Sequence, residues 1–580
     1  MNHASVELDA KMRNRLSIAI AVFLVSAQIA VGQIISSDRL VAWQGNVGIP
    51  GGIPTYNTTS AVISAGASLA TVNSAISACP SGQVVALSAG TYNFGTDMSL
   101  NDKVGVVVRG AGPNSTTITF SSGGVTMKSS DRGDSHLIGV NLSQNAVKGA
   151  STIFVASVPS WVTVGDLIGI DQLDDPIFST SGTGDSYRGA VGYGTRGVSQ
   201  LDRVVSKTST SVTFEVPMYW GWQTSLGAQI FQPHYDPSSG KAVTLCGIEG
   251  VTIKQTYAGG GVCCSSILLD SADNCWVKNC VVTNESGGSA VQGYFSYRCE
   301  VRHCTFVNSQ VLDGGDGYGV APYNNCSGWL TEDNIFVLLH ASMDAESASG
   351  NVFAYNYETK GQSAAGFNQN AAGSAHDTTS FMNLWEGNFT DDKMLADYTH
   401  GANAYGTVFR CRITGTNTVA ARVDDSQTPV SIQYYNRFWN IVGNVLGVTG
   451  VQNKYMTDNT STSTGSQGSI FKIGGDDLPL IDVNSYTSGA FVLIHGNWDS
   501  VQNTVTWNPL VSSQTLPNSC YLGGKPSYWG STQPWPPFDP ANPSGASRTN
   551  IPAGYRYVFG VDPPTTVMAP PPPLINLHAE

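Results

Sequence analysis

An apolar residue followed three positions later by Asn or Cys recurs seven times in the middle of the chain. The second position of this pattern is occupied by Cys280, Cys304, Asn334, Asn356, Asn388, Cys411 and Asn444, at steps of 24, 30, 22, 32, 23 and 33 residues. A period in the low twenties with strand-like composition indicates stacked units, because one such unit cannot bury its own apolar face. An Asn or a small thiol at one corner of every unit suits a β-solenoid, since an amide there can hydrogen-bond the backbone of neighbouring coils. The short steps predict coils that hold the stack, and the long steps predict coils with loops.

A short helix and the first strands are predicted before these repeats. Residues 70–79 place Val72, Ile76 and Cys79 on one face of an amphipathic helix. Such a helix would cap the open end of a solenoid, whose edge strand would otherwise be free to pair with other chains. Strands are predicted at 84–87, 104–109 and 116–120, with Gly-rich turns between them.

This region also carries a resemblance to known proteins. The segment AISACPSGQVVALSAGTY, followed by VVVRGAGPNSTTI, resembles the entry to right-handed parallel β-helix proteins of the pectate-lyase-like superfamily, which includes polysaccharide lyases and several glycoside hydrolase families. The resemblance covers roughly residues 60–450 and implies an all-β, right-handed parallel β-helix. It does not select a reaction, because this fold hosts many chemistries.

Five segments are predicted along the chain. Residues 1–32 read as a signal peptide, and 33–144 as the N-terminal cap with the first β-helix coils. Residues 145–235 interrupt the repeat with hairpin patterns and predict a small inserted β subdomain, after which 236–532 form the main β-helix with its loops. From 533 to 580 the chain is Pro-rich and predicts an extended tail.

Charge and the N-terminal segment suggest where the protein works. The net charge is −13, which argues against a nucleic-acid partner. Lys11, Arg13 and Arg15 precede an apolar run and then small residues up to Gly32, the order of a secretory leader. We therefore expect a secreted protein, extracellular or periplasmic, without a membrane anchor after cleavage and acting as a monomer.

The eleven cysteines are interpreted as structural. Cys275 and Cys299, like Cys280 and Cys304, are separated by one repeat of 24 residues, so they would stack as small apolar side chains. The short CxxC spacing of a zinc site is missing from these pairs, and no metal is predicted for the fold.

Candidate catalytic residues come from counting back from the ladder. Positions twelve residues before Asn356 and Asn388 are Asp344 and His376, which predicts that these two share a register on neighbouring coils. Glu346 and Asp397 have the same strand parity, and a bulge could bring His400 to the same face. Single acids on solenoid turns are commonly structural, so the hypothesis depends on their grouping. Two such carboxyl groups, one protonated and one ionised, are what glycoside hydrolysis requires.

The long repeats predict loops that would add substrate-binding residues to this groove. Candidate contacts are Asp313, Asp316, Tyr318, Tyr323, Arg422, Asp424 and Asp425. Carboxylates, aromatic rings and amides in one cleft are suited to binding a polysaccharide. Trp276, Trp329 and Trp385 lie near apolar strand positions and are assigned to the core or the groove wall. Glu386 is expected to face solvent beside the groove.

Three functions are compatible with this pattern. The first is a secreted glycoside hydrolase that cleaves a polysaccharide with paired carboxylates and needs no cofactor. The second is a polysaccharide lyase of the pectate type, which the resemblance also allows and which could use Ca²⁺, for example at Asp313 and Asp316. The third is a non-catalytic glycan-binding or adhesin surface protein, since β-solenoids also serve as extended binding surfaces. The unequal repeats count only against a purely structural stalk, which would need no loops gathered on one side.

Overall fold

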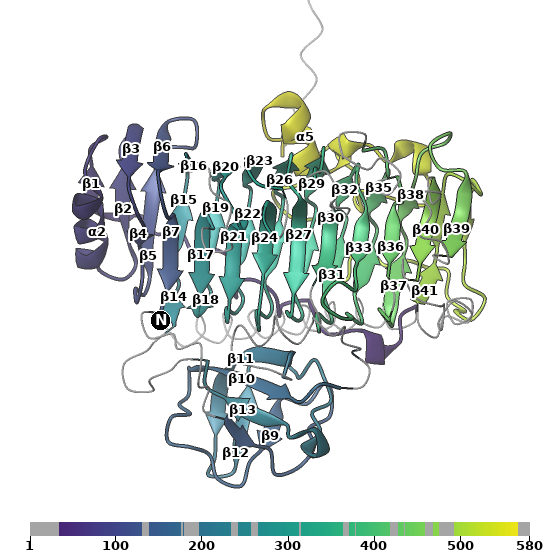
Figure 1. The fold of residues 1–580 in the computed structure, drawn as a ribbon, viewed down its shortest axis with the longest axis horizontal. Coiled ribbons are helices and arrows are strands. Elements are labelled where there is room, and N and C mark those ends of the chain that lie inside the picture. The colour runs from purple at the N-terminus through teal and green to yellow at the C-terminus, as the bar shows by residue number, and fades with distance from the viewer. Residues whose placement is uncertain are drawn as a thin grey trace, which may run out of the picture.

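Three long sheets wind around a common axis as a right-handed parallel β-helix (Figure 1). The computed structural model describes residues 34–129, 139–175, 178, 196–233, 242–256, 265–312, 315–363, 371–376, 379–417, 427–433, 435–458, 468–474 and 492–565. The predicted leader therefore lies outside the described residues. No helix in the described part of the chain is long and apolar enough to cross a membrane.

Each coil contributes one strand to each sheet in turn. Sheet 1 contains, in spatial order, β1 (Thr58–Ile63), β2 (Gln83–Leu87), β5 (Val106–Gly110), β15 (Gly247–Glu249), β19 (Trp276–Lys278), β22 (Glu300–Arg302), β25 (Leu330–Glu332), β28 (Val352–Ala354), β31 (Leu384–Glu386), β34 (Thr407–Phe409), β37 (Trp439–Val442) and β41 (Val492–His495). Sheet 2 contains β3 (Gly90–Phe94), β6 (Thr116–Phe120), β16 (Thr252–Gln255), β20 (Val281–Glu285), β23 (Thr305–Ser309), β26 (Ile335–Val337), β29 (Tyr357–Thr359), β32 (Phe389–Thr390), β35 (Arg412–Ile413), β38 (Val445–Leu446), β42 (Asn497–Asp499) and β43 (Thr504–Thr506).

Sheet 3 is the sheet on which the candidate site lies. Its strands are β4 (Met98–Ser99), β7 (Val125–Lys128), β17 (Ile267–Asp270), β21 (Ser289–Tyr294), β24 (Tyr318–Pro322), β27 (Ala341–Glu346), β30 (Ala371–His376), β33 (Met394–Ala396), β36 (Val430–Ile432), β40 (Ser469–Ile473) and β39 (Lys454–Asp458). A short parallel pair, β14 (Val243–Thr244) and β18 (Ala272–Asp273), lies between the sheets.

The predicted Asn ladder is present and bonds as expected. Asn356 Oδ1 accepts from Asn334 N at 2.9 Å, and Asn356 Nδ2 donates to Thr331 O at 2.9 Å. Asn356 N in turn donates to Asn388 Oδ1 at 2.9 Å. One amide side chain thus satisfies backbone groups of the preceding coil that would otherwise be buried without partners.

A second Asn ladder, which the sequence analysis missed, runs along the turn between sheets 3 and 1. Trp329 N donates to Asn351 Oδ1, and Asn351 N donates to Asn383 Oδ1, both at 2.9 Å. The missed signal was a second Asn five residues before each of Asn356 and Asn388.

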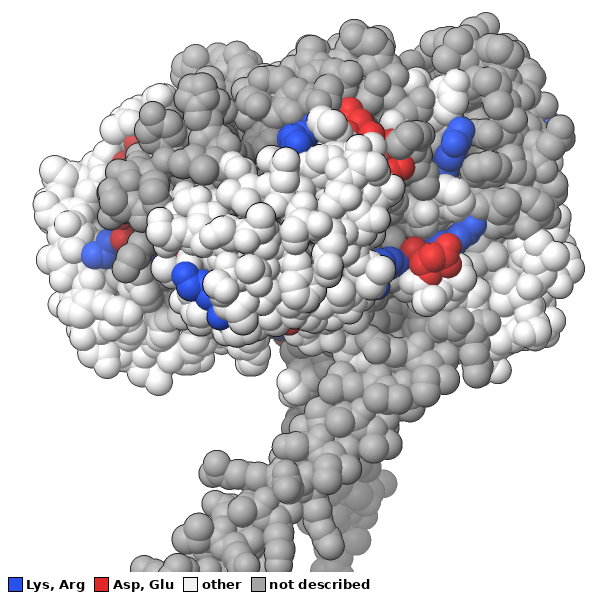
Figure 2. Space-filling view, turned by 90° about the horizontal axis from the view of Figure 1, so that it is seen from below, with Lys and Arg blue, Asp and Glu red and all other residues white. Residues whose placement is uncertain are grey.

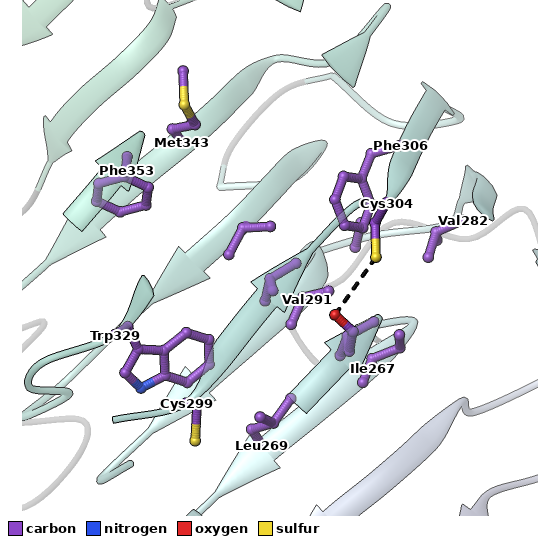
Figure 3. Packing of buried hydrophobic residues seen from close by; sticks show 14 of the residues in the cluster. Ile267, Leu269, Val282, Val291, Cys299, Cys304, Phe306, Trp329, Met343 and Phe353 are labelled. Atoms are coloured by element: carbon purple, nitrogen blue, oxygen red, sulfur yellow. Dashed lines mark hydrogen bonds between the residues drawn. The ribbon is translucent and has the colours of Figure 1, made fainter. Parts of the chain in front are cut away.

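The interior of the helix is a continuous stack of apolar side chains (Figure 3). Phe353 and Trp385 stack at 5.4 Å between ring centroids, and Trp385 stacks on Trp439 at 5.7 Å. The nine described cysteines are free, and Cys280 and Cys304 lie buried on neighbouring coils. The interpretation of the ladder cysteines as small core side chains is confirmed for these residues, and Trp276 and Trp329 are core residues as well.

The inserted subdomain is a six-stranded antiparallel sheet beneath the β-helix (Figure 1). Its spatial order is β8 (Gly139–Asn141), β13 (Gln229–Phe231), β10 (Leu167–Gln172), β11 (Val198–Lys207), β12 (Ser211–Phe214) and β9 (Thr152–Phe154), with a 3₁₀ turn η2 (Thr224–Leu226). It has its own apolar core and docks on the helix through Leu201 N, which donates to Ser327 Oγ at 3.0 Å. Seen from below, most of the described surface carries no charged side chain (Figure 2).

Both ends of the described chain pack against the helix. Helix α2 (Leu69–Ala78) lies at the N-terminal end of the stack and buries Val72 and Ile76, as its pattern predicts (Figure 1). The extended tail predicted from residue 533 is wrong up to residue 565. That segment folds onto sheets 1 and 2 and includes η4 (Pro543–Gly545), η5 (Arg548–Asn550) and α5 (Pro552–Phe559), of which α5 lies against β26 and β29 of sheet 2. Apolar residues between the prolines, such as Phe538 and Ile551, are fully buried there, which a count of prolines could not reveal.

Candidate active site

The outward side chains of sheet 3 form two columns that cross the stack. Strand pairing places Asp344 opposite Ser374 and Glu346 opposite His376, and the same register continues to Asp397. One column therefore reads Tyr294, Tyr323, Glu346, His376, Asp397 and Gln433, and the other reads Gln292, Ala321, Asp344, Ser374, Leu395 and Ser431.

This register corrects the predicted one by two residues. Asp344 was expected opposite His376, but Ser374 occupies that position. The reason is the length of the turn between sheets 3 and 1. Val352 and Leu384 pair with each other on sheet 1, but Asp344 lies eight residues before Val352 whereas Ser374 lies ten residues before Leu384. Counting back a constant twelve from the Asn ladder cannot detect this two-residue difference.

His376 and Asp397 form a tight pair at the centre of the first column. His376 Nδ1 lies 2.6 Å from Asp397 Oδ2, and Thr399 N donates to Asp397 Oδ1 at 2.9 Å. Burial alone would raise the pKa of Asp397, but the charge and hydrogen bond of His376 outweigh it and lower the pKa below its usual value. An ionised Asp397 holds a proton on Nδ1 of His376, so that Nε2 is the ring nitrogen that can take up or release the second proton.

Asp344 and Glu346, two residues apart on β27, form a coupled carboxyl pair. Burial raises the pKa of Asp344, while the neighbouring Glu346 carboxyl, the charge of His376 and the hydrogen bond from Ser374 Oγ partly counteract the rise. Asp344 Oδ2 is buried without a hydrogen-bond partner. Asp344 therefore holds a proton more readily than an exposed Asp would.

His400 packs beside this group without joining the column. Its ring centroid lies 5.0 Å from that of His376 at an interplanar angle of 70°. Burial, with the charge of His376, lowers the pKa of His400 to about 4. The side chain is therefore neutral around pH 7 and serves as a wall of the site.

A small pocket opens between the two columns. It is lined by Tyr318, His340, Ala341, Asp344, Ser374, His376, Leu395 and Asp397, and its volume of about 10 Å³ is room for roughly one water molecule. Such a water would touch carboxyl and imidazole groups that differ in protonation.

His340 is a member of this pocket that the sequence analysis missed. It is 2% exposed, its ring stacks on Tyr318 at 5.5 Å, and its Nδ1 donates to Asp316 O at 3.0 Å. A carbonyl only accepts, so this bond fixes the Nδ1 proton. The available signal was strand parity, because His340 and Asp344 are separated by an even number of residues.

The predicted substrate contacts have mixed outcomes. Tyr318 and Tyr323 lie on the outer face of sheet 3, where Tyr323 packs against Tyr294 at 5.7 Å between ring centroids. Asp316 is buried and accepts from Gly288 N at 2.5 Å, so its side chain holds a turn while its carbonyl orients His340. Asp313, Arg422, Asp424 and Asp425 lie outside the described residues.

Glu386 does not face solvent beside the groove, contrary to expectation. It is 1% exposed on the outer face of sheet 1, where it accepts from Tyr355 Oη at 2.5 Å and Cys520 N at 2.7 Å. The backbone at Cys520, which covers it, was expected to belong to the main β-helix of residues 236–532.

Two arginines of the neighbouring coils, Arg410 and Arg412, are bonded to backbone carbonyls away from sheet 3. Arg410 donates from Nε to Pro517 O at 2.7 Å, and Arg412 donates from Nη1 to Gly447 O at 2.9 Å. No group of three or more His, Cys, Asp or Glu side chains within the described ranges is arranged to hold a metal ion.

Comparison with known proteins finds distant likeness in fold only. No protein-family model matches the chain, and no curated protein matches it. Similar solved structures include the tailspike of Pseudomonas phage phi297 (11% identity, 70% of this chain and 78% of that chain, TM-score 0.38) and the tailspike of Acinetobacter baumannii bacteriophage AP22 in complex with capsular saccharide (12%, 76% and 72%, 0.40). A third is the polygalacturonase of Erwinia carotovora (9%, 73% and 95%, 0.27). The assignment of a β-helix rests on the strand topology described above. These distant likenesses do not identify an activity.

Proposed function

We propose that the protein is a secreted glycoside hydrolase that cleaves a polysaccharide in the groove on sheet 3. One observation carries the proposal: Asp344 is buried with one carboxyl oxygen unpartnered, which favours its protonated form, and on the same face His376 lies 2.6 Å from Asp397, which favours the ionised form of that carboxyl group. Glycoside hydrolysis needs groups in these two states on either side of the scissile bond.

The Asp344–Glu346 pair would act as the general acid. Its proton can pass to the glycosidic oxygen as the bond to the leaving sugar breaks, and the pair is then left ionised. Burial raises the pKa of Asp344, which keeps this proton available nearer to neutral pH than an exposed Asp could.

The Asp397–His376 pair would activate the water. Nε2 of His376 would take a proton from a water in the pocket, and the ionised Asp397 would stabilise the imidazolium that forms. Glu346 and Asp397 are two strands apart, about 10 Å at the backbone. Side chains that lean together bring the carboxyl groups into the ~6.5–9.5 Å range of inverting enzymes.

Hydrolysis is favoured over elimination by the charge of the site. A lyase acting on a uronic acid polymer has to neutralise the sugar carboxylate and uses a basic residue to remove a proton. Arg410 and Arg412 are committed to backbone carbonyls away from sheet 3. Three acids, Asp344, Glu346 and Asp397, lie buried just beneath this face, and their negative charge favours a neutral glycan over a polyanionic one.

Product analysis on neutral and uronic polysaccharides tests this proposal. We expect new reducing ends from a neutral polysaccharide without ultraviolet absorption from unsaturated sugars. Unsaturated ends would establish a lyase instead. Saturable binding with no new ends of either kind would indicate a glycan-binding surface protein.

A further inference from the structure

A second cleft lies where the N-terminal segment, the inserted sheet and the C-terminal segment meet. It has a volume of about 560 Å³ and shares no lining residue with the pocket on sheet 3. Volumes of ~300–1,000 Å³ are typical of small-molecule sites. The residues that matter for its chemistry are Leu40, Val41, Trp43, Lys148, Met218 and Cys520.

The walls of the cleft are mostly apolar. Leu40 and Val41 line the cleft and are only half-buried. Trp43 and Met218, which also line it, are buried. Trp43 is fixed in place because its Nε1 donates to Met382 O at 2.9 Å. Half-buried apolar side chains around a cleft gain free energy when an apolar molecule displaces water from them.

One cation, Lys148, borders this apolar cleft, and the carboxylate of Asp38 also lines the cleft but forms no ion pair with it. Lys148 Nζ donates to Ser37 O at 3.0 Å and Asp38 O at 2.7 Å, and its remaining contact is Met382 Sδ at 3.9 Å. Burial lowers the pKa of Lys148 to about 8, and the charge of the nearby Asp38 side chain offsets this only in part. The ammonium is therefore poorly solvated. An anion on the side of Nζ that now faces Met382 Sδ would stabilise its charge.

We propose that this cleft binds a small amphipathic carboxylate, such as a medium-chain fatty acid. The carboxylate would lie against Lys148 Nζ in place of the weak contact to Met382 Sδ, and the chain would lie along Leu40, Val41 and Met218. A single cation beside apolar walls matches one negative group on an apolar body, whereas a sugar would need several polar partners. The site is independent of the glycan groove and of the activity proposed for it.

The test uses decanoate, with decanol as a neutral analogue, in calorimetric titrations of the full-length protein. We expect decanoate to bind at one site and Lys148→Met to weaken it by roughly tenfold or more, the usual effect of losing a charge-assisted hydrogen bond. Lys103→Met is the matched control, because Lys103 Nζ also donates to a backbone carbonyl, Ser77 O at 2.8 Å, but far from the cleft. Val41→Trp should weaken binding by filling the cleft, and melting curves show whether each variant is folded.

Three outcomes would overturn the proposal. The wild type could show no decanoate binding, decanol could bind as tightly as decanoate, or Lys148→Met could bind like Lys103→Met. The first outcome would show that the cleft does not bind this class of ligand. The second or the third would show that Lys148 does not recognise the carboxylate. None of these outcomes bears on glycan cleavage, so the two proposals fail separately.

Discussion

Sheets 1 and 3 both bury carboxylates on their outer faces, yet they do so in opposite ways. On sheet 1, Glu332 accepts from Tyr521 Oη at 2.5 Å and lies 2.9 Å from Arg302. Its acids are neutralised by donors that the terminal segments or neighbouring strands bring to them. On sheet 3, Asp344 has Ser374 and another carboxyl group as neighbours and borders a water-sized pocket. Burial of an acid does not mark an active site.

The largest expected difference between the two faces is in catalysis. His376→Ala removes the proposed base and should lower the rate of glycan cleavage by about 10³-fold, within the range for general acid–base groups. His303→Ala is the matched control, because His303 Nδ1 also lies 2.8 Å from an aspartate, Asp333, but next to α5. We expect that control to keep the wild-type rate per folded molecule. Equal losses in both variants would contradict the assignment.

The Asn ladder supports both faces and should give the largest effect on stability. Asn356→Ala leaves Asn334 N and Thr331 O buried without their partner, which should lower the free energy of unfolding by about 3 kcal/mol. Denaturant unfolding measures this change, with Asn114→Ala on the surface as the control. A loss as small as that of the control would mean that water replaces the amide.

The fold was largely predictable because the ladder is a local rule repeated many times. An Asn or Cys every 22 to 33 residues with an apolar partner specifies the coil, and register errors do not accumulate from one coil to the next. The site was less predictable, because it depends on the two extra residues between Ser374 and Leu384 and on parity at His340. Glu386 was misplaced because nothing near it in the sequence shows that residues around Cys520 cover it.

Stability and pH should be linked through sheet 1. Burial raises the pKa of Glu386 to about 7, so the folded state favours its protonated form. Its contribution is fully present below the unfolded pKa near 4.5 and is lost as pH rises through about 7. We expect the free energy of unfolding to fall by on the order of 2 kcal/mol over this window, and Glu386→Gln should flatten the fall. A slope that is unchanged in this variant would assign the pH dependence to other groups.

The smallest effect concerns the segment that covers sheet 1. Tyr521→Phe removes one hydrogen bond to Glu332 and should cost about 1 kcal/mol, because Arg302 still compensates the charge. Thermal unfolding measures the cost, and the rate of glycan cleavage should not change. A slower rate in Tyr521→Phe would show that the two faces are coupled.

The most direct test compares one buried acid from each face. Reducing ends released from a neutral polysaccharide are measured for Asp344→Asn and Glu332→Gln, at equal amounts of folded protein. Asp344 and Glu332 are 0% and 2% exposed, so the two substitutions are matched in burial. We predict that Asp344→Asn lowers the rate by about 10²–10⁴-fold and that Glu332→Gln leaves it unchanged. Wild-type turnover in Asp344→Asn, or an equal loss in both variants, would contradict an active groove on sheet 3.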